Sequence, residues 1–119
     1  MKGSLLVIEL GEVFTAADLQ RFVDEMEQFE LQLAVTPSRV IDMRSVTRAP
    51  VDFQALYSLA ERRRTFQPRN PIRTAGLAIT PVAIGYARMF QTLMADHPLV
   101  TLKLFESFEE AERWALSEA

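Results

Sequence analysis

Hydrophobic residues along this chain follow two patterns, short continuous runs and longer stretches in which they recur every three or four positions. Continuous runs of this length, closed by glycine, proline or polar residues, are typical of buried strands. They predict four strands, at residues 5–10, 39–43, 72–80 and 99–105. The three- and four-residue spacing predicts a helix after each strand, at residues 16–33, 53–64, 81–96 and 108–115.

Capping residues support the predicted helix starts. Thr15 with Asp18, and Ser107 with Glu110, have the three-residue spacing of a capping box, and Asp52 places a carboxylate before the second helix. Strand and helix then alternate four times, which requires crossover connections between parallel strands. The pattern therefore predicts a single α/β domain over residues 1–119, with a four-stranded, mainly parallel sheet and four helices.

Composition narrows the classes of protein to which the chain can belong. Its 119 residues, 49% of them hydrophobic, are enough for one core. The absence of cysteine excludes disulfides, thiolate metal sites and a cysteine nucleophile, and is compatible with a reducing compartment. The apolar run after Met1–Ser4 is interrupted by Glu9 and is too short for a signal peptide. No run reaches the roughly 18 apolar residues of a membrane-spanning helix, so we expect a cytoplasmic protein, soluble or in peripheral contact with a membrane.

Four segments of the chain resemble a known protein family in their order and spacing. They are residues 11–19, 40–47, 85–90 and 105–114. Together they resemble the STAS-like fold of anti-sigma-factor antagonists, in particular its small bacterial branch related to lipid-transfer domains. The resemblance implies a regulatory binding module. Antagonists of this fold carry a phosphorylatable serine at the start of the helix after the second strand. Residues 49–52 read Ala-Pro-Val-Asp at that place, and Ser45 and Thr47 lie upstream of it, so the phosphorylation switch is not expected here.

Polar side chains beyond the second predicted strand form the first candidate site. Asp42, Arg44 and Ser45 follow the carboxyl end of a strand, where open α/β sheets commonly bind ligands. Tyr86 and Arg88 of the third helix complete a candidate pocket for a lipid carrier, a small-molecule carrier or an enzyme. The simpler interpretation is that Asp42 accepts hydrogen bonds from the turn after it. We favour that interpretation, because no second carboxylate, base or nucleophile accompanies Asp42.

Signatures of cofactor and metal sites are missing from the sequence. The four glycines form neither a Walker loop nor a G-x-G-x-x-G turn. His97 is the sole histidine, and its place beside Pro98 predicts a surface turn residue rather than a general base or a metal ligand. We therefore expect no metal, no cofactor and no catalytic residue.

Charge is distributed unevenly along the chain. Residues 1–38 hold two basic and seven acidic side chains, whereas residues 39–73 hold eight and three. Within the basic segment, Arg62, Arg63 and Arg64 are consecutive and form a candidate anion-binding cluster; the alternative is a solvated face. Nucleic-acid binding is not expected, because the formal net charge is −3 and the basic segment lacks interleaved exposed aromatic residues.

The third predicted helix carries apolar residues around most of its circumference. Met89 and Phe90 are adjacent, about 100° apart around the helix axis, so one is expected to point into the sheet and the other away from it. The side of such a helix that the sheet does not bury is usually covered by a neighbouring helix, another subunit or a ligand. We expect a homodimer. The leading hypothesis is a non-enzymatic STAS-like module that binds a protein partner or a small apolar or anionic ligand.

Overall fold

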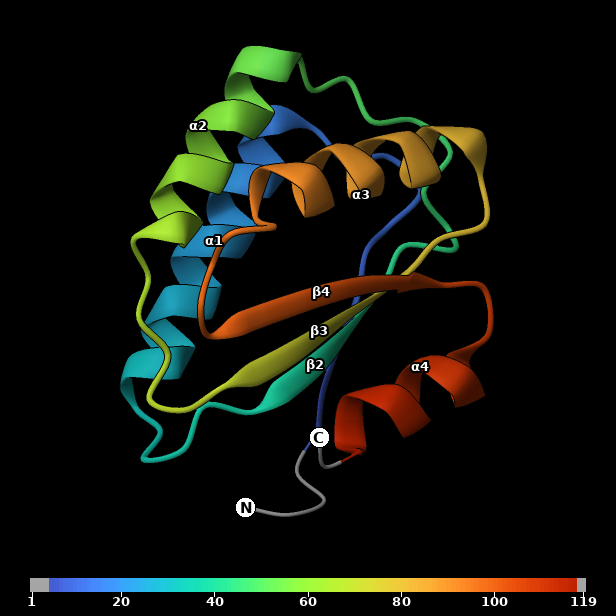
Figure 1. The fold of residues 1–119 in the computed structure, drawn as a ribbon. Coiled ribbons are helices and arrows are strands. Elements are labelled where there is room, and N and C mark those ends of the chain that lie inside the picture. The colour runs from blue at the N-terminus through green and yellow to red at the C-terminus, as the bar shows by residue number, and fades with distance from the viewer. Residues whose placement is uncertain (1–4, 118–119) are drawn as a thin grey trace.

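A single sheet of four parallel strands lies at the centre of the molecule (Figure 1). The computed structural model describes residues 5–117, so Met1–Ser4, which entered the argument about a signal peptide, lie outside the described residues. In spatial order the strands are β1 (Leu5–Glu9), β2 (Ser38–Asp42), β3 (Ile72–Leu77) and β4 (Val100–Phe105). The predicted alternation of four strands and four helices is confirmed, and all four strands are parallel.

The helices cover the two faces of the sheet unequally (Figure 1). One face carries α1 (Ala16–Leu31), α2 (Phe53–Arg64) and α3 (Pro81–Leu93), and the other carries α4 (Phe108–Leu116). Each of the first three helices connects a strand to its immediate neighbour, always in the same direction across the sheet. Crossovers of one hand in one direction place their helices on one face. The fold is therefore a sheet with a three-helix layer on one side and a single helix on the other.

Local hydrogen bonds explain where the helices begin. Thr15 and Asp18 form the predicted capping box, in which each side chain accepts a hydrogen bond from the backbone N–H of the other, at 2.9 and 3.1 Å. Asp52 accepts from the N–H of Ala55 at 2.8 Å. The third strand was expected to continue to Thr80 but ends at Leu77, because the Thr80 hydroxyl caps α3 instead.

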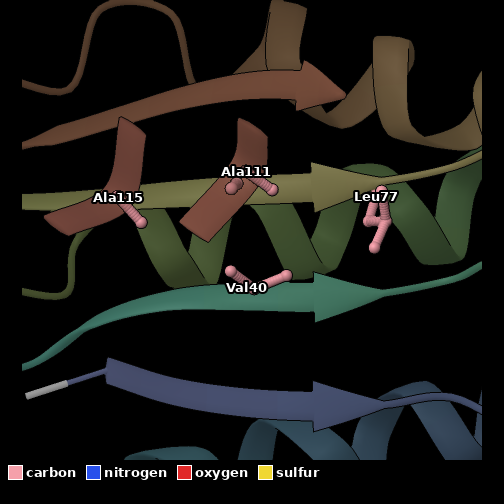
Figure 2. Close-up of a cluster of buried hydrophobic side chains, with 5 residues drawn as sticks. Val40, Leu77, Ala111 and Ala115 are labelled. Carbon is pink, nitrogen blue, oxygen red and sulfur yellow. The ribbon is translucent and has the colours of Figure 1, made fainter. Parts of the chain in front are cut away.

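The face under α4 is tightly packed with small side chains. Ala111 and Ala115 of α4 lie against Val40 of β2 and Leu77 of β3, and each is at most 4% exposed (Figure 2). Alanine at both helix positions lets the helix approach the sheet closely. Side chains alternate between the faces of a strand, so the neighbours Arg39 and Ile41 face the three-helix layer.

Candidate functional site

A cavity of about 140 Å³ lies between the sheet and the three-helix layer. Its floor is formed by β2, β3 and β4, and its walls and roof by α1, α2, α3 and the loops after β1 and β2. We call it the main cavity. Its lining residues are Leu10, Phe14, Leu19, Phe22, Ile41, Met43, Val46, Ala49, Val51, Leu56, Leu59, Thr74, Gly76, Ala83, Tyr86, Ala87, Phe90, Leu102 and Leu104.

Small residues at facing positions leave this space. Gly76 lies on the floor, and Ala83 and Ala87 are the buried residues of α3 above it. A Cβ atom at Gly76 would come within 2.9 Å of Leu104 Cδ2 and 3.3 Å of Met43 Cε, so larger neighbours close around the glycine. Ala83 and Ala87 add little side-chain volume on the α3 side, so part of the space between this helix and the sheet stays open.

The lining of the main cavity is almost purely hydrocarbon. Among its described lining residues, only Thr74 and Tyr86 carry a side-chain oxygen or nitrogen. The Tyr86 hydroxyl donates a hydrogen bond to the Val51 carbonyl, which ties α3 to the segment before α2. These lining residues supply no carboxylate, imidazole or amine, so they offer no general base to a bound molecule.

A second, smaller cavity of about 70 Å³ lies next to the main cavity. We call it the side cavity. The two share part of their walls, namely Phe22, Ile41, Leu59, Thr74, Phe90 and Leu102. Two arginines, Arg39 and Arg63, line the side cavity and have no counterpart in the main cavity. The apolar space under the three-helix layer is therefore bordered by two guanidinium groups at the side cavity.

Arg39 and Arg63 belong to a buried ion network around Glu30 of α1. Arg39 Nη1 lies 2.6 Å from Glu30 Oε2, and both side chains are 2% exposed. Arg63 donates to both carboxylate oxygens of Glu30, at 3.1 and 3.2 Å. Burial lowers the pKa of the Arg39 guanidinium, and the Glu30 carboxylate opposes that effect. The network joins β2, α1 and α2.

The predicted site residues Asp42, Arg44 and Ser45 lie in a turn whose other residues, Met43 and Val46, line the main cavity. Asp42 accepts hydrogen bonds from the Arg44 backbone N–H and Nε, both at 3.0 Å, and from Arg44 Nη2 at 2.8 Å. These bonds hold the pKa of Asp42 below its usual value. Arg44 and Ser45 are exposed, and none of the three residues lines a cavity. The arrangement is the turn-stabilising one that the sequence favoured.

The predicted residues of α3 divide between interior and surface. Tyr86 lines the main cavity, and Phe90 lines both cavities. Arg88 is exposed, and Met89 is half-buried outside the cavity walls. The candidate pocket is thus split, because Tyr86 lies in the interior whereas Asp42, Ser45 and Arg88 do not line the cavity. Homodimer formation stays a prediction.

The predicted anion-binding arginines are each paired with carboxylates of this chain. Arg62 contacts Asp24 and Glu27 of α1, and Arg63 contacts Glu27 and Glu30. Arg64 lies apart from them, with Glu61 and Asp96 as partners. The acidic first segment and the basic middle segment of the sequence therefore meet between α1 and α2. An external anion at these arginines stays a prediction, and it would compete with these carboxylates.

The expectation that His97 lies on the surface is wrong. His97 is only 8% exposed, and its ring lies 2.8 Å from the Phe66 carbonyl through Nε2 while Nδ1 accepts from the Leu99 N–H at 3.0 Å. With both ring nitrogens engaged, the histidine links the connection between α3 and β4 to the segment that follows α2. Within residues 5–117, no group of three or more histidine, aspartate or glutamate side chains is placed to hold a metal ion.

Comparisons with models of protein families, with curated proteins and with solved structures found no match. No helix within residues 5–117 combines the length and apolarity needed to cross a bilayer. The buried charge that the sequence analysis did not single out is that of Arg39, which is 2% exposed. The sequence contains the information needed to find it, because Arg39 precedes Val40 and Ile41 in a buried strand. Both faces of such a strand are covered, and a charged side chain on a covered face requires a partner.

Proposed function

We propose that this protein is a non-enzymatic binding module that holds a small apolar ligand in its main cavity. The observation that carries the proposal is an apolar space of about 140 Å³ beneath the three-helix layer. An apolar cavity of about 150 Å³ in another protein stays free of water and binds benzene. A ligand portion of that size, a six-membered ring or a short alkyl chain, fits the main cavity.

The contrast between the two faces of the sheet supports a binding role for the cavity. Under α4, the side chains of Val40, Ala75, Leu77, Ala111 and Ala115 are at most 4% exposed. The same sheet under α1, α2 and α3 borders two partly open cavities. Unfilled apolar volume costs roughly 24 cal/mol per Å³, so a ligand that fills this volume would stabilise the fold.

The chemistry of the lining supports binding rather than catalysis. Thr74 and Tyr86 are the lining residues with side-chain oxygens, and the Tyr86 hydroxyl is already bonded to a backbone carbonyl. Bond-making and bond-breaking reactions need a positioned base, acid or nucleophile. A carrier or ligand-controlled regulatory module needs only the shape and the apolar lining. Such a module is in keeping with the STAS-like resemblance of the sequence.

Filling the cavity tests this function. In the Ala87→Leu variant, the added side chain enters the main cavity from α3, whereas Ala17→Leu adds the same atoms at an exposed position of α1. Benzene and 1-octanol should raise the urea midpoint of the wild-type protein and of Ala17→Leu, because a ligand bound to the folded state stabilises it by mass action. Both ligands should have little effect on Ala87→Leu.

Circular dichroism of each variant establishes that it is folded before ligand is added. Failure of both probes to stabilise the wild-type protein would contradict the proposed function. Equal stabilisation of Ala87→Leu and Ala17→Leu would contradict the assignment to the main cavity.

A further inference from the structure

We propose that the ligand is an amphiphilic monocarboxylate, whose hydrocarbon chain occupies the main cavity and whose carboxylate reaches past the side cavity to accept a hydrogen bond from the buried Nε of Arg39. This inference rests on the proposed function and names the class of ligand. Its geometric basis is a buried arginine with one unused donor at the end of an apolar interior.

The guanidinium of Arg39 uses two of its three nitrogens within the protein. Nη1 donates to Glu30 Oε2 at 2.6 Å, and Nη2 donates to the Pro37 carbonyl at 2.8 Å. Nε is buried and has no hydrogen-bond partner among residues 5–117. A buried N–H without an acceptor is destabilising, and a charged donor binds an anionic acceptor most strongly.

The position of Arg39 connects this donor to the apolar space. The side chain is 2% exposed and lines the side cavity, which shares Phe22, Ile41 and Phe90 with the main cavity. A molecule that extends from one cavity into the other would pass along these shared walls. It would place a hydrocarbon chain against apolar residues and its head group beside Arg39.

The charges around Arg39 select a monoanion. Arg39 and Arg63 face the single carboxylate of Glu30 in the most buried part of the network. Glu27 pairs chiefly with the more exposed Arg62, and its contact with Arg63 is longer, at 3.5 Å. Counted with Arg62, Asp24 and Glu27, the network is balanced, with three guanidinium groups against three carboxylates. A bound monocarboxylate therefore adds one negative charge beside Arg39, whereas a phosphate dianion adds two and would also have to lose more hydration.

A matched pair of probes separates the head group from the chain. Octanoate and 1-octanol share an alkyl chain of eight carbons and differ at the polar end. We expect the wild-type protein at pH 7 to bind octanoate about tenfold or more tightly than 1-octanol, as measured by titration calorimetry, because one charge-assisted hydrogen bond is gained. The ¹⁵Nε–¹H resonance of Arg39, assigned by its loss in Arg39→Lys, should shift with octanoate and stay in place with 1-octanol.

Two variants test whether the preference for octanoate over 1-octanol depends on Arg39. In the double variant Glu30→Gln, Arg39→Met, the ion pair is removed as a unit, which buried pairs tolerate better than loss of one partner. Its preference for octanoate should disappear while 1-octanol still binds. Arg73→Met is the matched control, because Arg73 contacts Trp114 on the α4 face of the sheet. This control should keep the wild-type preference.

The outcomes distinguish the head-group inference from the function on which it rests. Equal binding of the two probes, with an unmoved Arg39 resonance, overturns the carboxylate site and leaves the apolar-ligand function standing. Failure of octanoate, 1-octanol and benzene alike overturns both. Should the double variant unfold, the probe comparison and the Arg39 resonance of the wild-type protein still decide the question.

Discussion

Glu30→Gln should destabilise the protein more than Arg39→Met, although both changes break the same buried ion pair. The difference follows from what each change leaves behind. Glu30 accepts from both Arg39 and Arg63, so a methionine at position 39 leaves the carboxylate with Arg63 at 3.1 and 3.2 Å. Glutamine at position 30 leaves Arg39 in the interior without a carboxylate partner, and Arg63 keeps only its longer contact with Glu27, at 3.5 Å.

The expected magnitudes follow from this asymmetry. Removal of one partner from a buried pair costs about 3–5 kcal/mol, and we expect Glu30→Gln to fall in that range. Arg39→Met should cost about 1–3 kcal/mol, the usual loss for a buried polar group that keeps part of its bonding. The double variant should be less destabilised than Glu30→Gln alone, because the methionine removes the buried charge that glutamine leaves uncompensated.

Urea unfolding followed by circular dichroism measures these differences. With a slope of about 2 kcal/mol per molar urea, a gap of about 2 kcal/mol separates two midpoints by about 1 M. Arg64→Met is a suitable reference, because this arginine is 38% exposed and solvent screens its pairs with Glu61 and Asp96, so its midpoint should stay close to that of the wild-type protein. A midpoint for Glu30→Gln equal to or above that of Arg39→Met would refute the reasoning.

Three further predictions concern positions outside this network. His97→Ala should lower the unfolding free energy by about 1–3 kcal/mol in urea titration, because the buried imidazole satisfies backbone groups on both sides of its ring. Hydrogen bonds from Arg44 lower the pKa of Asp42, so this carboxylate contributes stability that is present above its unfolded pKa of about 3.9 and is lost as the pH falls through the lower folded value. Asp42→Asn should therefore weaken the acid dependence of unfolding, measured below about pH 4. Gly76→Ala should cost less than about 1 kcal/mol in the same urea assay, because the side-chain ends that the new methyl group meets are flexible and border open space; a cost of several kcal/mol would show that those side chains are fixed.

The architecture could be predicted from the sequence because its signals are local. Thr15, Asp18 and Asp52 cap their helices as the spacing indicated, and the apolar runs became the four strands. The observed end of β3 differs from the predicted one because Thr80 suits both a strand and a helix cap. Thr80 is suited to a strand by its β-branched side chain, but its hydroxyl caps α3.

The cavities could not be predicted, because they depend on residues that are distant in the sequence. Gly76, Ala83 and Ala87 are each unremarkable in an apolar segment, and the space appears only when β3 and α3 are opposed. His97 was placed on the surface by its neighbour Pro98, whereas its burial depends on Phe66, 31 positions earlier. The uneven charge along the chain was a sign of contact between α1 and α2, which only the tertiary fold makes visible.

The placement of α4 has a consequence for how the chain acquires its structure during synthesis. The ribosome makes β1 to β4 and the three connecting helices first, and during that time the opposite face of β2 and β3 lacks the residues that cover it. Without α4 against this face, Val40 and Leu77 would lack the cover that Ala111 and Ala115 give them. A chain in which α4 has not yet docked would therefore expose an apolar surface on β2 and β3, and chaperones bind surfaces of this kind during folding.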